Sequence, residues 1–176
     1  MMASRPDCPL ACPSQADLDS FRRAGIDVMA LATPTAMQVA TGDVAHDGLL
    51  EPDAAGERWF AFREDAADDI VFWQRESGRL TSWSGRGFAL GQDNISQAAT
   101  YSFDCALNIF ADPVDWLRAR RDGVVVLPNN WPAAFDRLRD CPRIAIAERL
   151  LPIYRRNMRP GRMPELFILP RRRSVA

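Results

Sequence analysis

The sequence between residues 104 and 169 contains four short apolar runs: ALNIF at 106–110, GVVVL at 123–127, RIAIA at 143–147 and ELFIL at 165–169. Segments with helix-like patterns separate these runs from one another. Such an alternation is typical of a parallel sheet whose strands are joined by crossover helices. Because crossovers of this kind are right-handed, we expect the carboxyl ends of all four strands to lie on one edge of the sheet.

The region before this sheet has the pattern of antiparallel strands. Residues 58–63, 69–74 and 79–84 are rich in aromatic and β-branched side chains and have the length of strands. We expect them to form a meander, with 88–90 continuing it and 99–103 adding a further strand. Aromatic side chains at this density can stack on nucleobases, but far more often they form the core of a sheet, and we favour the core.

The first part of the chain predicts two short helices. Ser14 begins a capping-box pattern, which opens an amphipathic helix that ends at Gly25. Threonine followed by proline at 33–34 predicts a second helix, which would end at Gly42. The polar residues from 43 to 57 predict a loop.

Together these patterns predict the fold class and the organisation of the chain. The fold class is α/β within an arrangement that is α+β overall: an antiparallel β-meander, then a small, mainly parallel sheet with crossover helices, plus a short N-terminal helical annex. We assign the annex and its loop to residues 1–57, and the meander with the α/β domain to residues 58–176. We expect the meander and the α/β domain, residues 58–176, to form one compact unit.

Hydropathy and cysteine usage indicate the compartment. No apolar run approaches the ~20 residues of a membrane-spanning helix, and the N-terminus lacks the basic and apolar segments of a secretory signal. We therefore expect a cytoplasmic protein without a membrane partner, whose 4 cysteines stay reduced. No feature of the sequence indicates an oligomeric state.

The net charge of −1 conceals a strong asymmetry between the two halves of the chain. Residues 118–176 contain 14 arginines and 5 acidic residues, whereas residues 1–117 contain 8 arginines and 18 acidic residues; lysine is absent. Arginine binds phosphate groups bidentately, so the basic half predicts contact with nucleic acid or a replication protein. Alternatively, the absence of lysine reflects codon composition, and the acidic half folds against the basic half. The predicted nucleic-acid-binding residues are Arg118, Arg121, Arg155, Arg156, Arg159 and Arg162.

Polar residues follow the predicted parallel strands at the edge where ligands of such sheets bind. They are Asp112, Asp115, Asn129, Asn130 and Glu148. Asp112 and Glu148 together are suitable for a magnesium ion, which prefers one or two carboxylates. The alternative is structural: Asp112 and Asn130 stand at helix-capping positions, and Glu148 lies in the first turn of a helix, where the dipole favours an acid. We favour the structural interpretation.

The residues that usually hold metals and cofactors are scattered in this chain. Cys8 and Cys12 have the spacing of half a zinc site, but Cys105 and Cys141 are far away and single, and His46 is the only histidine. A phosphate-binding P-loop requires a lysine, which the chain lacks. We therefore predict no metal, no cofactor and no catalytic residue.

The segment IFADPVDWL at 109–117 carries a resemblance to a known family. It resembles the first strand and following turn of the Toprim domain, the α/β metal-binding module of primases and topoisomerases, whose pattern is E-G-P-x-D. Pro113 and Asp115 match that pattern, but Ala111 stands where the family has its catalytic glutamate. The family's D-x-D pair corresponds to Glu148 followed by arginine and leucine. Over residues 58–169 the chain thus resembles a degenerate, Toprim-like domain of the mobile-element primase type.

The resemblance and the charge pattern lead to three hypotheses about function. The first is a non-catalytic accessory protein of DNA replication or of a mobile element, which contacts nucleic acid or a replication partner through its arginine-rich C-terminal half. The second is a protein–protein adaptor or inhibitor without nucleic-acid contact. The third is a metal-dependent phosphoryl-transfer enzyme. We favour the first, because an alanine in place of the glutamate cannot hold the metal that such chemistry needs.

Overall fold

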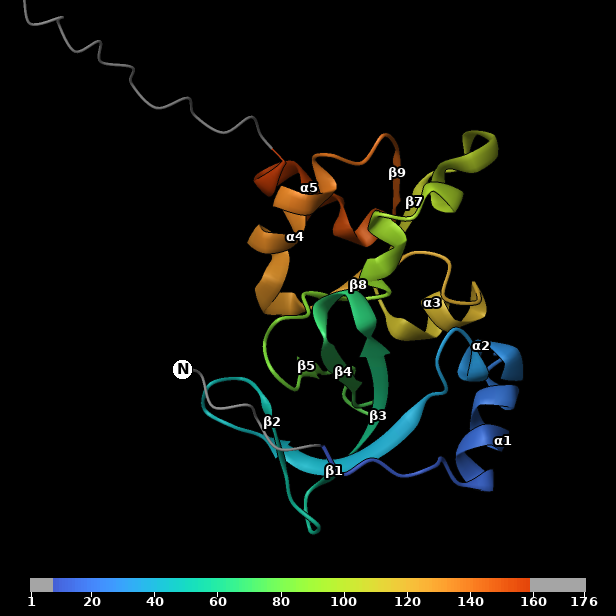
Figure 1. Cartoon of the computed structure of the whole chain (residues 1–176), viewed down its shortest axis with the longest axis vertical. Coiled ribbons are helices and arrows are strands. Elements are labelled where there is room, and N and C mark those ends of the chain that lie inside the picture. The colour runs from blue at the N-terminus through green and yellow to red at the C-terminus, as the bar shows by residue number, and fades with distance from the viewer. Residues whose placement is uncertain (1–7, 159–176) are drawn as a thin grey trace, which may run out of the picture.

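Two β-sheets of different kinds form the framework of the molecule, as Figure 1 shows for this computed structural model, which describes residues 8–158. The first sheet contains β1 (Gln38–Val44), β2 (Leu50–Pro52), β3 (Glu57–Glu64), β4 (Asp69–Trp73) and β5 (Leu80–Ser82). The second contains β6 (Ala89–Leu90), β7 (Leu107–Phe110), β8 (Val124–Val126) and β9 (Ile144–Ile146). The α-helices are α1 (Gln15–Arg23), α2 (Val28–Ala32), α3 (Pro113–Arg118), α4 (Trp131–Leu138) and α5 (Leu151–Asn157). Short 3-10 helices are η1 (Asp65–Ala67), η2 (Gln92–Ile95), η3 (Ala98–Asp104), η4 (Pro128–Asn130) and η5 (Glu148–Leu150).

The first sheet is a curled antiparallel sheet with the strand order β2-β1-β3-β4-β5. The predicted meander of β3, β4 and β5 is confirmed, and β1 and β2 extend it at the side of β3. The alternation of side chains along β3 divides its aromatics between two cores. Trp59 packs with Phe72 on one side of the sheet, whereas Phe60 packs with Trp73 on the other. The aromatic residues of the meander are therefore core, as expected.

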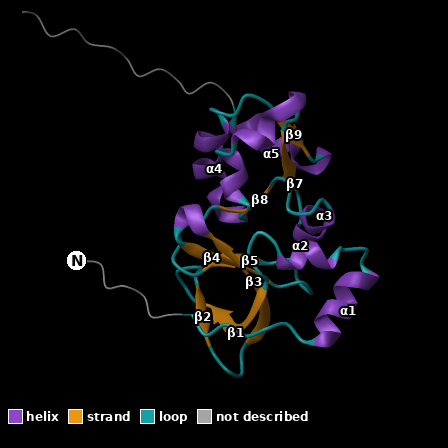
Figure 2. Cartoon of the chain, turned by 45° about the vertical axis from the view of Figure 1, so that its right-hand side comes forward, coloured by secondary structure: helices purple, strands orange, loops and turns teal. Residues whose placement is uncertain are grey.

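The face of the first sheet that carries Phe60 is covered by the N-terminal helices and by α3. Phe21 of α1, Leu31 of α2 and Trp116 of α3 all belong to the same buried cluster as Phe60. Figure 2 shows α1 and α2 beside the sheet, with α3 next to α2. The helix α1 is confirmed where the sequence predicts it, with Ser14 accepting a hydrogen bond from the Asp17 N–H at 3.3 Å in a capping box.

The second sheet has the strand order β6-β8-β7-β9, and β7, β8 and β9 are parallel. The chain moves from β7 to β8 in one direction and from β8 past β7 to β9 in the other. Crossovers of one hand must therefore place α3 and α4 on opposite faces. This is observed, because Leu117 of α3 packs on Val125 from one side and Phe135 of α4 packs on Ile109 from the other. The predicted fold class is confirmed.

The prediction of a helix from residue 33 to Gly42 is wrong. The helix in this region is α2, which begins earlier and is capped by Asp27, whose carboxylate accepts from the Met29 N–H at 3.0 Å. The Thr33–Pro34 peptide is cis, and the chain then enters β1. Pairing of β1 with β3 overrides the local capping signal, because it satisfies the backbone of the whole strand. The predicted loop at 43–57 likewise contains the end of β1 and all of β2.

Two further strand predictions are wrong. Residues 88–90 do not continue the meander, because β6 pairs antiparallel with β8 in the second sheet. Residues 99–103 lie in η3, where Thr100 and Tyr101 donate side-chain hydrogen bonds to the carbonyls of Asn94 and Ile95 at 2.8 and 2.9 Å. Such bonds favour a compact turn over a strand. The predicted strand at 165–169, like Arg159 and Arg162, lies outside the described residues.

The chain leaves the first sheet at a turn that one buried carboxylate holds. Asp69, at the start of β4, accepts hydrogen bonds from the backbone N–H groups of Ser84, Arg86 and Gly87 at 2.8, 2.9 and 2.8 Å. Its own neighbour Ile70 donates a fourth at 2.8 Å. The acid thereby satisfies N–H groups that have left the strand ladder and directs β6 into the second sheet.

Replacing Asp69 by alanine tests this role. Asp69→Ala leaves four N–H groups without their acceptor, and the hydrogen bonds of two of them, Ile70 and Gly87, are buried. Each unsatisfied buried group costs roughly 1–3 kcal/mol, so we expect a loss of at least about 2 kcal/mol of unfolding free energy. Urea unfolding followed by circular dichroism measures it. Asp136→Ala, which removes an exposed acid from α4, is the control and should change stability by less than about 1 kcal/mol. Equal losses in both variants would contradict the assignment.

Candidate functional site

The structure brings the predicted strand-end residues to one edge but engages most of them in local contacts. Asp112 caps α3 by accepting from the Asp115 N–H at 3.0 Å, and its other oxygen pairs with Arg149 of η5. Asp115 pairs with Arg118 at 3.1 Å. The cap by Asp112 is therefore confirmed. Within residues 8–158 no three acidic, histidine or cysteine side chains converge as a metal site would require.

The two asparagines and Glu148 complete that edge. Asn130 precedes α4 without capping it, contrary to expectation; its amide instead donates to the Gly87 carbonyl at 3.1 Å. This bond joins η4 to the turn that Asp69 holds. Asn129 and Glu148 are exposed to solvent. The residues at this edge thus form mainly helix caps, ion pairs and hydrogen bonds around the ends of β7, β8 and β9.

The arginines predicted to meet nucleic acid do not form one surface. Arg118 and Arg121 belong to α3 and the turn after it, which cover one face of the second sheet. Arg155 and Arg156 lie in the last turn of α5, which packs with α4 on the opposite face. Both of the latter are exposed, and neither forms an ion pair with another described residue.

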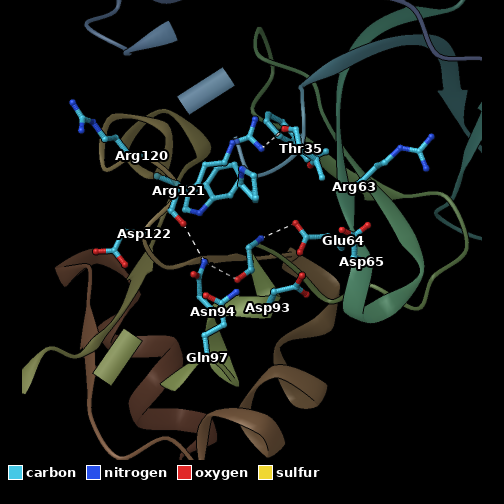
Figure 3. Close-up of a pocket in the computed structure, with 14 residues that line it drawn as sticks. Thr35, Arg63, Glu64, Asp65, Asp93, Asn94, Gln97, Arg120, Arg121 and Asp122 are labelled. Atoms are coloured by element: carbon cyan, nitrogen blue, oxygen red, sulfur yellow. Dashed lines mark hydrogen bonds between the residues drawn. The ribbon is translucent and has the colours of Figure 1, made fainter. Parts of the chain in front are cut away.

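A cavity of about 370 Å³ opens where the two sheets meet (Figure 3). Its wall is built from the end of β3, residues 34–35, the first turn of η2 and the turn that follows α3. We call this cavity the junction pocket. It contains two buried ionisable side chains, Arg121 from the turn after α3 and Glu64 from the end of β3.

Arg121 is the most unusual residue of the pocket, with only 6% of its surface exposed. Its guanidinium lies over the rings of Phe62 and Trp116, 4.9 and 5.5 Å from their centroids, and Nη1 donates to the Thr35 carbonyl at 2.9 Å. The other two nitrogens, Nε and Nη2, are buried and have no hydrogen-bond partner among the described residues. Burial lowers the pKa of Arg121 to about 10, so the side chain is still a cation at neutral pH.

Glu64 lies at the end of β3 and is also almost fully buried. Its carboxyl group accepts from the backbone N–H groups of Gly91 and Gln92 at 2.7 and 3.0 Å. Burial nevertheless raises the pKa of Glu64 from 4.5 to about 8, although these N–H groups and Arg121 favour the charged form. At neutral pH the carboxyl group is therefore mostly protonated.

The turn that carries Arg121 is held by a second set of hydrogen bonds. The Asn94 amide donates to the carbonyls of Arg121 and Gly123, both at 3.0 Å, and the Trp116 indole donates to Gly123 at 2.9 Å. Gly91 has a φ of 69°, and a Cβ there would lie 2.4 Å from the Gly123 carbonyl oxygen. Only glycine permits this close approach between η2 and the turn. The position of the Arg121 side chain is therefore fixed by the backbone around it.

Part of this site has a signal in the sequence. Phe60, Phe62 and Glu64 alternate along one strand, so the periodicity places Glu64 on the buried face. Arg121 was singled out as a basic residue, but its burial has no sequence signal, because Thr35 and Phe62 come from distant segments.

Comparison with known proteins identifies no relative of this chain. No protein-family model, no curated protein and no solved structure matches the chain. None of the helices in the part of the chain from residue 8 to residue 158 has the length and apolar character of a membrane span.

The raised pKa of Glu64 predicts a pH dependence of stability. Because the folded state holds this proton more tightly than the unfolded chain, its contribution to stability is present below pH 4.5 and is lost as the pH rises to about 8. The change amounts to roughly a few kcal/mol. Glu64→Gln should therefore show a flatter profile of unfolding free energy between pH 5 and 9 than the unmodified protein. Glu51→Gln, at an exposed position of β2, is the control and should leave the slope unchanged. If the profile of Glu64→Gln has the same slope as that of the unmodified protein, the prediction is contradicted.

Proposed function

We propose that this protein binds a small anionic ligand in the junction pocket, with the Arg121 guanidinium as its anchor. The observation that carries the proposal is the buried pair of nitrogens, Nε and Nη2, without a partner in residues 8–158. An unpaired buried charge costs several kcal/mol, so such an arrangement is unfavourable unless another group completes it. An anion supplies both the charge and the acceptors.

The chemistry of the free edge indicates which anions fit. Nε and Nη2 point from the same edge of the planar guanidinium, the edge that binds a carboxylate or two phosphate oxygens through parallel hydrogen bonds. The other edge is already fixed by the Thr35 carbonyl, and the rings of Phe62 and Trp116 hold the plane from its face. The anchor is thus preorganised, which lowers the entropic cost of binding.

We assign binding rather than catalysis to this protein. The Toprim resemblance implies a metal-dependent site at the strand-end edge, yet Ala111 follows β7 in place of the glutamate and Asp112 pairs with Arg149. An alanine cannot ligate a metal ion. On this proposal the chain is a degenerate, Toprim-like scaffold, and its function is recognition.

An anion titration tests the anchor. Acetate and inorganic phosphate, in separate series, should raise the melting temperature of the full chain in a saturable way, because a ligand that binds only the folded state stabilises it. Arg121→Met, which keeps an unbranched apolar stem but lacks the guanidinium and its charge, should abolish the response while leaving the ligand-free protein at least as stable. Arg118→Met, which removes an exposed charge from α3, should respond like the unmodified protein.

Two results would contradict the anchor. One is an unmodified protein whose melting temperature does not depend on anion concentration. The other is an Arg121→Met variant that responds as the unmodified protein does, since the anion would then bind elsewhere.

As a further expectation, anion affinity should fall above pH 8, where Glu64 ionises and compensates Arg121.

A second candidate function is contact with nucleic acid, as a non-catalytic accessory protein of DNA replication or of a mobile element. The observation that favours it is the exposure of Arg155 and Arg156 on α5 without an ion pair to any described residue, with Arg137 exposed on the neighbouring α4. Cations free of local partners are the kind that release counterions from DNA. A replication protein with an acidic surface is the alternative partner.

Salt-dependent binding to duplex DNA tests this candidate. The affinity should fall steeply with salt, by a slope of about 0.9 per phosphate contacted on logarithmic axes, and the Arg155→Ala/Arg156→Ala double variant should reduce that slope by up to about 2. Arg22→Ala/Arg23→Ala, on the acidic N-terminal side of the chain, is the control of equal charge change. Fluorescence anisotropy measures both. Binding that is absent, or that both double variants weaken equally, would reject a role for α5.

A further inference from the structure

The rim of the junction pocket carries charges opposite to that of its anchor. Asp65, Asp93 and Asp122 line the same cavity as Arg121, and none of the three forms an ion pair with a described residue. Among residues 8–158, the only hydrogen bond to their carboxylates comes to Asp93, whose Oδ1 accepts from the Ala66 N–H at 3.3 Å. Figure 3 shows Asp93 across the pocket from Thr35, the residue that holds the Arg121 guanidinium.

The basic residues near the rim do not neutralise these acids. Arg120 lines the pocket but pairs with Asp27 of the α2 cap at 3.0 Å. Arg63 is exposed and points away from the acids in Figure 3. The pocket therefore combines a buried cation, aromatic rings and three carboxylates that lie on different sides of its rim.

We propose that the ligand of the junction pocket is a zwitterion of the amino-acid type, whose carboxylate binds Arg121 and whose ammonium group binds the acidic rim. This inference rests on the proposed function, because it assumes Arg121 as the anchor. The rim acids alone would not indicate a ligand. Arg121 lines the same cavity, and two of its buried nitrogens have no hydrogen-bond partner in residues 8–158, so the pocket combines groups of opposite charge.

Electrostatics and size exclude the main competitors. A phosphate dianion brings excess negative charge toward three carboxylates, and each like-charge contact at about 4 Å costs roughly 1 kcal/mol in water and more near a protein surface. A metal ion at the rim is disfavoured, since no three suitable ligands converge within residues 8–158. A cavity of about 370 Å³ is at the small end of ligand pockets, which suits an amino acid.

Calorimetric titration of the full chain with matched probes tests the inference. The probes are butyrate, 4-aminobutyrate, butylamine and inorganic phosphate, together with glycine and 6-aminohexanoate to vary the distance between the charges. At least one amino acid should bind about tenfold more tightly than butyrate, and butylamine should bind more weakly than either. Asp93→Asn or Asp122→Asn should remove this advantage without changing butyrate affinity, whereas Asp115→Asn, outside the pocket, should change neither.

The outcomes separate this inference from the proposed function. If butyrate binds as tightly as every amino acid, or if phosphate binds most tightly, the ligand is a simple anion and the zwitterion is wrong, while the Arg121 anchor stands. If the Asp→Asn variants keep the full advantage, the rim plays no part and the inference is likewise overturned. If no probe binds, or Arg121→Met binds them all unchanged, the proposed function fails as well.

Discussion

The hydrogen bonds from the backbone N–H groups that follow β6 to the Glu64 carboxyl group join the two sheets of this protein. Glu64 ends the longest strand of the first sheet, and Gly91 begins the turn that leaves the second. Asn94, in the same turn, holds the backbone that presents Arg121. The segments that join the two sheets also line the junction pocket. They contribute its two buried ionisable groups, Glu64 and Arg121.

The separation of charge in the pocket follows from burial. A cation that lies on two aromatic rings in a poorly solvated site interacts strongly with any anion that reaches it. Glu64 does not fill this role at neutral pH, since burial raises its pKa to about 8. The aspartates of the rim remain solvated and are available to a second group. On this proposal, Arg121 and the rim aspartates are sufficient for one small cavity to recognise a ligand with two opposite charges.

The strands and helices with strong local patterns could be predicted from the sequence, and the connections could not. The alternation in β3 and the apolar runs of β7, β8 and β9 identify core, because burial dictates their periodicity. The helix predicted at residues 33–42 is wrong, because pairing of β1 with β3 outweighs the threonine–proline capping signal. The strand-end acids Asp112 and Asp115 follow β7, but their bonds to Arg149 and Arg118 depend on side-chain geometry that no spacing reveals. The pocket was missed because its walls come from four distant segments.

The free edge of Arg121 is the central claim, and the Nε–H group of that residue reports on it directly. In a ¹H–¹⁵N NMR spectrum of the arginine Nε region, assigned with Arg121→Met, this resonance should be protected from solvent exchange by its burial. Adding 4-aminobutyrate or acetate should move it downfield in a saturable titration, as a hydrogen bond to a carboxylate forms, while the Arg118 resonance stays in place. An Arg121 resonance that no carboxylate moves would contradict the account.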